Sequence, residues 1–222
     1  CTHYLTTTKE VLDNPDFNEA AKFVCSPALR DREDCEALWQ ALSDGLLTAV
    51  SSDHCGIDVA ELKQAGRNDF TQIPNGSPGA GDRLHMVWTE GVCTGKLTRQ
   101  KFVDVIATQP AKINGIYPRK GTLAVGSDAD VVIFDPNYEG TVHLADNPNG
   151  VDYNLYEGRR QSGRVETVLL RGQVVVDQSR SKLICRVLIL QDLRFAHPWT
   201  EKVRRCDLQI RIGPVVAEAE IP

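Results

Sequence analysis

The sequence predicts an α/β fold that gives way, near residue 120, to antiparallel β-structure. Two short apolar runs, Lys22–Cys25 and Leu46–Ser51, flank a segment whose apolar residues recur at helical spacing, which is the pattern of a parallel strand–helix–strand unit. After Gly121 the pattern changes to short apolar runs separated by turn residues, which is typical of hairpins. We therefore expect an α/β region at 1–120, β-strands at 121–177, and a divergent tail at 178–222.

The helix of the strand–helix–strand unit is predicted from Arg32 to Asp44. Leu38 and Leu42 lie on one face of it, four residues apart. Asp31 can cap its first turn, and Gly45 stands just past its end, where a left-handed residue usually closes a helix. Both apolar runs beside this helix are predicted to be buried strands.

A long Gly/Pro/Asn-rich segment follows at residues 55–81 and contains the sequence TQIPNGSPGAG. It is too long and too irregular for a simple connection, so we expect a functional loop. Helices are predicted at 82–92 and 97–107, and Pro110 suits the first turn of a short third helix.

The segment from Gly121 predicts two hairpins. GTLAVGSDADVVIFDP reads as two strands around a Gly-Ser-Asp turn, and VETVLLRGQVVVD reads as a hairpin that turns at Arg171 and Gly172.

Composition excludes several classes of function. A net charge of −5 argues against non-specific nucleic-acid binding, which needs a basic face. No apolar run approaches the roughly 20 residues that cross a bilayer. Seven cysteines without paired spacing indicate reduced thiols, so we expect a cytoplasmic protein.

Two polar residues follow the predicted strands directly. Ser26 comes after the first apolar run and Asp53 after the second, which places both on one rim if the strands are parallel. A carboxylate there can hold a divalent cation or act as a general base, or it can simply cap the following turn. We expect His54 to be a packing residue and Cys55 a small buried thiol.

Five motifs give a more specific reading. CTHYL, FVCSPALRD, SSDHC, IPNGSPGAGDRL and GTLAVGSDADVVIFDP occur in this order. Together they resemble the C-terminal part of the dihydropyrimidinase/hydantoinase family, which belongs to the amidohydrolase superfamily. The resemblance covers residues 1–177. It implies the C-terminal part of a TIM-like (β/α)8 barrel at 1–120, followed by strands of a small β-sandwich at 121–177.

The resemblance also implies a chemistry. Enzymes of this family open 5,6-dihydropyrimidine or hydantoin rings to N-carbamoyl amino acids with a hydroxide activated by two zinc ions, and they assemble as homotetramers. Asp53 matches the aspartate that binds zinc and carries the proton from the hydroxide to the leaving nitrogen. Ser26 and Asn75 match the residues that hold the amide and imide groups of the ring.

Most of the family's metal ligands have no counterpart here. The His-x-His pair, the carboxylated lysine, two further histidines and the oxyanion-stabilising tyrosine all precede the stretch matched by CTHYL, so Asp53 is the one ligand retained. We therefore expect this chain to be inactive and poorly stable alone.

Two other readings remain open. One is a non-catalytic scaffold like the collapsin-response mediators, which share this fold; the presence of Ser26, Asp53 and Asn75 together argues against it. The other is an allantoinase- or dihydroorotase-type hydrolase. SDHC and IPNG favour the dihydropyrimidinase branch, although Gly56 and Ile57 replace its usual Pro-Phe.

Overall fold

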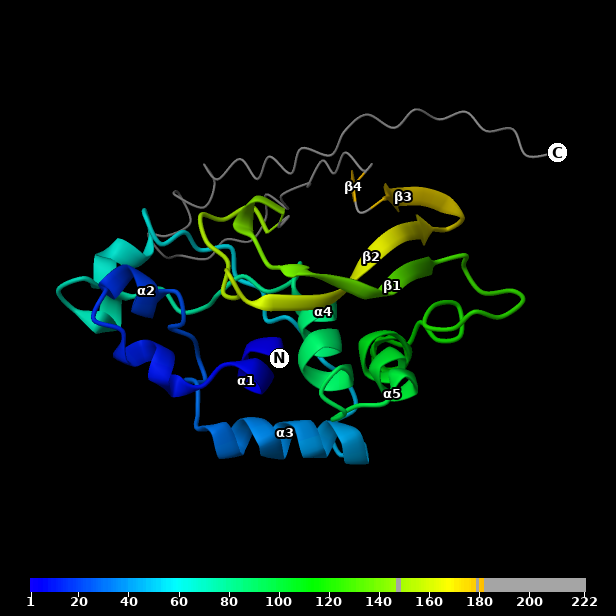
Figure 1. The fold of residues 1–222 in the computed structure, drawn as a ribbon, viewed down its shortest axis with the longest axis horizontal. Coiled ribbons are helices and arrows are strands. Elements are labelled where there is room, and N and C mark those ends of the chain that lie inside the picture. The colour runs from blue at the N-terminus through cyan, green and yellow to red at the C-terminus, as the bar shows by residue number, and fades with distance from the viewer. Residues whose placement is uncertain (147–148, 179, 182–222) are drawn as a thin grey trace.

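A computed structural model describes residues 1–146, 149–178 and 180–181 (Figure 1). A four-stranded antiparallel sheet in the order β1-β2-β3-β4 lies against a layer of helices. In Figure 1, α4 and α5 lie on one side of β1 and β2, and α3 runs beyond them. The elements are α1 (Thr2–Thr6), α2 (Phe17–Ala21), α3 (Arg32–Asp44), α4 (Arg83–Val87), α5 (Arg99–Val103), α6 (Gln109–Ile113), β1 (Val131–Thr141), β2 (Arg160–Leu170), β3 (Gln173–Asp177) and β4 (Arg180–Ser181), with short 3-10 helices at Lys9–Asp13, Lys63–Gly66, Phe70–Gln72 and Leu144–Asp146.

Helix α3 confirms the prediction at both ends. Asp31 and Asp34 form a capping box, in which each side chain accepts from the backbone N–H of the other residue. Gly45 ends the helix in the left-handed region with φ 82°. The buried residues Trp39 and Leu42 face the interior, and Trp39 Nε1 donates to the carbonyl of Leu5, 2.9 Å away.

The next two helical segments are longer than their α-helical parts. α4 continues into a π-helical turn, η4 (Trp88–Val92), and α5 continues through η5 (Asp104–Thr108) into α6. Thr98 caps α5 by accepting from the backbone N–H of Lys101. The predicted helices are therefore confirmed, but the second and third form one continuous segment.

The hairpin that turns at Arg171 and Gly172 is confirmed. These two residues have φ values of 51° and 80°, as the central residues of a type I′ turn require, and they join β2 to β3. The first strand predicted after Gly121 is wrong. Leu123 and Val125 are 74% and 107% exposed and form no ladder among the described residues. The partner of β1 is β2, not the segment at 121–125.

Both apolar runs beside α3 were predicted to be strands, and both predictions are wrong. A strand needs a neighbour to share its backbone hydrogen bonds. In Lys22–Cys25 and Leu46–Ser51 the backbone groups bond instead to loops, helix ends and side chains. Just after the second run, His54 and Ser77 form an isolated parallel β-bridge.

Two apolar clusters hold the helices to each other and to the sheet. The larger one joins α1, α3, η4 and α5, and Trp88 packs edge-on against Phe102 and Phe134, with ring centroids 5.2 and 4.8 Å apart. The sheet docks on η4 through Thr89, whose hydroxyl donates to the carbonyl of Ser162 and accepts from its N–H. The second cluster consists of Val59, Met86, Val142, Tyr153, Leu155 and Tyr156.

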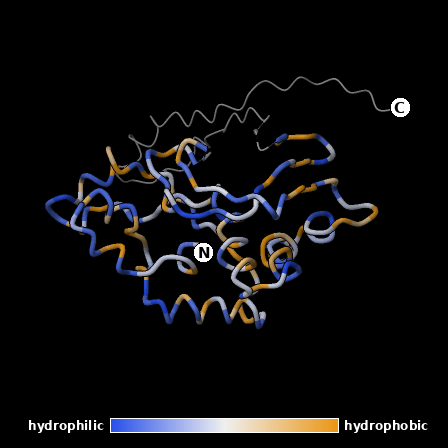
Figure 2. The backbone as a smooth tube through the Cα atoms, in the orientation of Figure 1, coloured by the Kyte–Doolittle hydropathy of each residue, from blue (hydrophilic) through white to orange (hydrophobic). Residues whose placement is uncertain are grey.

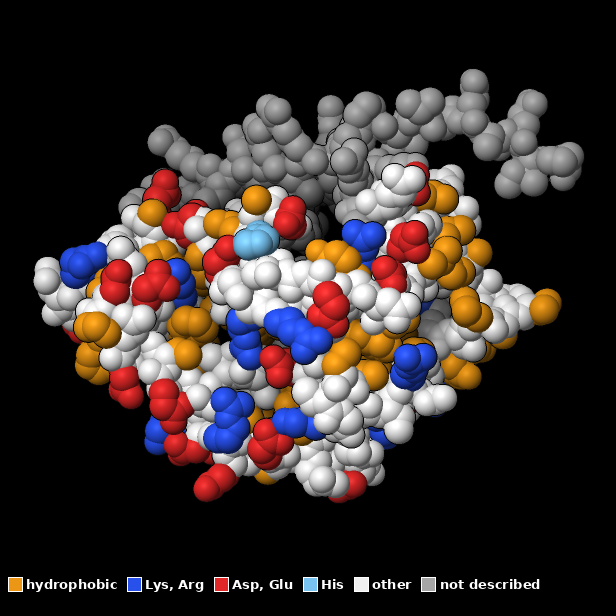
Figure 3. Space-filling model, in the orientation of Figure 1, with side chains coloured by type: hydrophobic (Ala, Val, Ile, Leu, Met, Phe, Trp, Pro, Cys, Tyr) orange, Lys and Arg blue, Asp and Glu red, His pale blue; other side chains and the backbone are white. Residues whose placement is uncertain are grey.

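The far end of the sheet carries apolar side chains in contact with solvent. Figure 2 shows apolar segments along β3 and the adjoining end of β1, and Figure 3 shows apolar side chains gathered over this part of the surface. Val132, Ile133, Leu170 and Val174 are each 43–51% exposed. The predicted tail at 178–222 lies almost wholly outside the described residues.

Candidate functional site

The structure brings two of the predicted site residues into direct contact. The Ser26 hydroxyl donates to Asn75 Oδ1 at 3.0 Å, across 49 positions of sequence. The same two segments are joined by their backbones, because the N–H of Gly76 donates to the carbonyl of Val24 at 3.0 Å. Ser26 and Asn75 are both exposed, so they present polar groups to solvent at one end of the helical layer.

The segment that follows Asp53 is bonded to the same loop. Cys55, two residues after Asp53, donates its backbone N–H to the carbonyl of Ser77 at 2.9 Å. The backbone N–H groups of Gly79 and Ala80 point at His54 Nδ1, at 3.3 and 3.5 Å. His54 therefore bonds to the glycine-rich loop, but it is exposed, so the expectation that it packs in the interior is wrong.

The backbone of Asp53 adopts an uncommon conformation. Its φ is 50°, in the left-handed region that few residues other than glycine adopt, although aspartate tolerates it better than most. Such residues concentrate at functional sites, since the surrounding structure must hold them there. The Asp53 side chain is exposed, and no sequence signal pointed to this conformation.

Helix α1 contributes charged and polar neighbours that the sequence did not single out. Burial lowers the pKa of His3 to about 4, while the carboxylate of Asp53 acts in the opposite direction. Burial also raises the pKa of Tyr4, with Cys25 and Asp53 adding to the effect. The Tyr4 hydroxyl donates to the carbonyl of Pro27 at 2.6 Å, which ties α1 to the segment that carries Ser26.

The long loop is anchored at its start by two aspartates. The carboxylate of Asp152 accepts from the N–H groups of Val59 and Ala60, at 2.9 and 2.8 Å. In return the N–H of Asp152 donates to Asp58 Oδ1 at 3.0 Å. Burial raises the pKa of Asp58, and this hydrogen bond partly offsets that effect. These reciprocal bonds attach the segment between β1 and β2, at residue 152, to the loop at 58–60.

The described residues do not complete a metal site on their own. Within that part of the chain, no three His, Cys, Asp or Glu side chains come together as a metal-binding group. Protein zinc sites use three or four such ligands, and two-metal sites share still more. Asp53 can supply one carboxylate ligand, so the part of the chain that the structure describes does not by itself fit a two-zinc centre.

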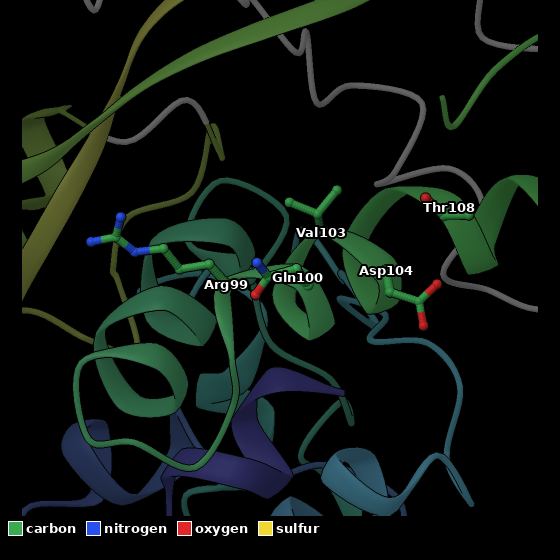
Figure 4. A pocket seen from close by; sticks show the side chains of 5 residues that line it. All are labelled: Arg99, Gln100, Val103, Asp104 and Thr108. Carbon is green, nitrogen blue, oxygen red and sulfur yellow. The ribbon is translucent and has the colours of Figure 1, made fainter. Parts of the chain in front are cut away.

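One pocket lies elsewhere on the surface. It has a volume of about 450 Å³ and follows the exposed face of α5 and η5, where Arg99, Gln100, Val103, Asp104 and Thr108 line it (Figure 4). None of the predicted site residues lines this pocket. It is formed along one helical segment, and the polar groups that converge around the 75–80 loop lie away from it.

Comparison with known proteins gives the family. The model of the amidohydrolase family matches residues 2–175. The chain is 49% identical over 178 residues to a D-hydantoinase from Ralstonia pickettii, which covers 80% of this chain and 38% of that relative. It is 39% identical over 173 residues to a dihydropyrimidinase from Arabidopsis thaliana, which covers 78% of this chain and 32% of the relative.

Solved structures agree with the sequence matches. The dihydropyrimidinase from Brevibacillus agri NCHU1002 superimposes with a TM-score of 0.80 at 45% identity, over 82% of this chain and 39% of that one. An L-hydantoinase from Arthrobacter aurescens gives a TM-score of 0.73 at 32% identity, over the same shares of the two chains.

The fold and these matches define a member of the amidohydrolase family, and the chain belongs to it. Its similarity is to the D-hydantoinases and dihydropyrimidinases, as the five motifs indicated. The chain spans less than two fifths of the length of these relatives. In the part of the chain that the structure describes, no helix is both long enough and apolar enough to span a membrane.

Proposed function

We propose that this chain is the ring-binding part of a cyclic-amide hydrolase that opens hydantoin or 5,6-dihydropyrimidine rings to N-carbamoyl amino acids. The observation that carries the proposal is the contact of Ser26 with Asn75 at 3.0 Å, beside the loop that also holds His54 and the segment of Asp53. The names of the most similar relatives support the substrate class.

The roles of the side chains follow from their chemistry. A hydantoin or dihydropyrimidine ring offers alternating N–H donors and carbonyl acceptors, and hydroxyl, amide and backbone groups recognise such a pattern. Ser26, Asn75 and the adjoining backbone would bind and orient the ring. Asp53 would take a proton from the water-derived nucleophile as its oxygen bonds to the ring carbonyl carbon, and would return that proton to the ring nitrogen as the carbon–nitrogen bond breaks.

Zinc enters the proposal only by resemblance to the family. Asp53 would be one of its ligands, and the described residues supply no complete set, so we assign no step to the metal. We expect the isolated chain to show no ring opening and to bind far fewer than two zinc ions. Robust turnover by the isolated chain would contradict this expectation.

The architecture of the whole protein is part of the same proposal. By similarity to the matched structures, residues 1–120 would form the last part of a (β/α)8 barrel, and residues 121–177 would form strands of a small β-sandwich. A homotetramer in the cytoplasm is expected from the family resemblance. Sedimentation of the protein in its native extract tests the assembly.

A chimera tests the function directly. The matched segment of the Ralstonia pickettii D-hydantoinase is replaced by residues 1–177 of this chain, and opening of hydantoin and dihydrouracil is followed. We expect a folded, active chimera, and loss of activity in its Asp53→Asn variant with ring binding retained. A folded chimera that loads metal but opens neither ring would refute the proposal, and a non-catalytic scaffold would then become the better reading.

A further inference from the structure

Lys63 is a fully buried lysine that contacts the segment leading to Ser26. Its exposure is 0%, and it begins the short 3-10 helix at Lys63–Gly66. Burial lowers the pKa of its ammonium to about 8. Among the described residues no carboxylate forms an ion pair with it, and a buried charge without a counter-ion is costly. If position 63 only filled space in the interior, an apolar side chain would be more stable there. The buried charge therefore needs another explanation.

The hydrogen bond of Lys63 explains why a charged side chain is buried here. Its Nζ donates to the carbonyl of Val24 at 3.4 Å, and the same carbonyl accepts from the N–H of Gly76 at 3.0 Å. Val24 stands two residues before Ser26, and Gly76 directly follows Asn75. The Val24 carbonyl is therefore the junction of the two segments that carry Ser26 and Asn75, and Lys63 provides its second donor.

The segment of Asp53 adjoins the same junction. The Gly76 backbone is packed tightly against Cys55, since a Cβ placed on Gly76 would come within 2.5 Å of its Sγ. Cys55 stands two residues after Asp53, and Gly76 shares the Val24 carbonyl with Lys63. The carbonyl that Lys63 contacts therefore lies close to all three site segments.

Among the described residues, no sheet ladder holds the segment that Lys63 contacts. The carbonyl of Lys22 accepts from the Ser77 hydroxyl at 2.6 Å and from the Tyr153 hydroxyl at 3.4 Å. Side chains and the loop backbone therefore replace the hydrogen bonds that a neighbouring strand would give. Removing one of these donors should let the segment move relative to the loop.

We propose that Lys63 is a positioning residue for ring binding: its ammonium fixes the Val24 carbonyl and thereby sets the separation of Ser26 and Asn75. That Lys63 positions these segments rests on the geometry alone. That this positioning matters for ring binding rests on the proposed function.

Hydrogen exchange of the 222-residue chain tests the positioning without any activity. Lys63→Met removes the charge and the donor but keeps the length, Lys63→Arg keeps both, and Lys112→Met changes an exposed lysine of α6 as the matched control. We expect exchange in peptides 22–27 and 74–80 to rise roughly tenfold or more in Lys63→Met, to return towards the parent rate in Lys63→Arg, and to stay unchanged in Lys112→Met. Unchanged exchange, or an equal rise throughout the chain, would overturn the proposal. If Lys63→Met does not fold, Lys63→Gln, which drops the charge but keeps a donor, replaces it.

The chimera adds a readout of ring binding. In it we expect Lys63→Met to raise KM roughly fivefold or more while kcat changes less than twofold, because binding is impaired and the chemical groups remain. An equal fall in kcat and kcat/KM would contradict a positioning role. An inactive chimera that has its native Lys63 counts against the proposed function, and the exchange experiment still decides the role of Lys63.

Discussion

The anchor at Asp152 gives a prediction that can be worked through in numbers. Its carboxylate accepts from the N–H groups of Val59 and Ala60, at 2.9 and 2.8 Å. Val59 is 6% exposed, so its N–H has no water to replace the lost bond in Asp152→Ala, whereas Ala60 is exposed and can bond to water. A buried donor left without a partner costs about 1–3 kcal/mol, so we expect a loss of about 2 kcal/mol.

Asp152→Asn separates hydrogen bonding from charge. The amide keeps one acceptor oxygen in the same place, so one of the two bonds can persist, and we expect a loss of about 1 kcal/mol. For a chain of this size these losses correspond to falls in Tm of roughly 6 °C and 3 °C.

Thermal and urea unfolding of the three proteins measure these values. Asp13→Ala, at an exposed aspartate, serves as the matched control and should lie within about 0.5 kcal/mol of the parent. If Asp152→Ala unfolds with the same free energy as the parent, or if Asp152→Asn is the less stable of the two variants, the reasoning about the anchored loop is wrong.

Three further predictions concern the core and its pH dependence. Burial lowers the pKa of His3 to about 4 in the folded chain, against about 6.5 when unfolded. As the pH falls below 6.5 the unfolded chain takes up this proton first, so the fold loses stability until His3 also titrates near 4. A His3→Gln variant should show a shallower loss of stability between about pH 6.5 and 4 in unfolding titrations. A Cβ on Gly163 would lie 2.5 Å from Cζ of Phe134, whereas one on Gly95, with similar positive φ, meets nothing within 4 Å. Gly163→Ala should therefore be less stable than Gly95→Ala by about 1–3 kcal/mol in urea unfolding, and equal losses would show that only the backbone matters. Leu42→Ala should cost about 2–5 kcal/mol in the same assay, because Leu42 is 2% exposed in the larger apolar cluster; a cost below 1 kcal/mol would mean that the cluster can close over the gap.

Local signals explain which elements the sequence predicted correctly. Asp31 and Gly45 mark the ends of α3 because capping depends on residues within one helical turn. Arg171 and Gly172 mark the hairpin because a two-residue turn depends on its own backbone angles. Residues near in sequence decide both features, so no knowledge of the rest of the fold was needed.

The two strands predicted beside α3 are absent for the opposite reason, since residues far away in the sequence decide whether a strand forms. An apolar run becomes a strand only if another segment offers it a ladder. In Lys22–Cys25 the N–H groups of Phe23 and Val24 bond three residues back, and the donors to the carbonyls of Lys22 and Val24 come from residues about 40 to 130 positions away. The contact of Ser26 with Asn75 is equally distant in sequence, and only the family resemblance suggested it. Spacing rules gave no signal for Lys63 or for the left-handed backbone of Asp53.

The way in which residues 22–26 are held has a consequence for how substrate preference can be altered. A ladder strand shifts only as a unit, because a change of register moves every pair at once. Here hydroxyl groups from Ser77 and Tyr153 and the ammonium of Lys63 act as separate supports, each from a different stretch of the chain. Ser77 and Tyr153 share the Lys22 carbonyl, whereas Lys63 bonds the Val24 carbonyl. Changing a donor at one carbonyl should tilt the segment by a small amount and leave the bond at the other in place. Under the proposed function, this gives two separate points at which the ring-binding surface can be adjusted.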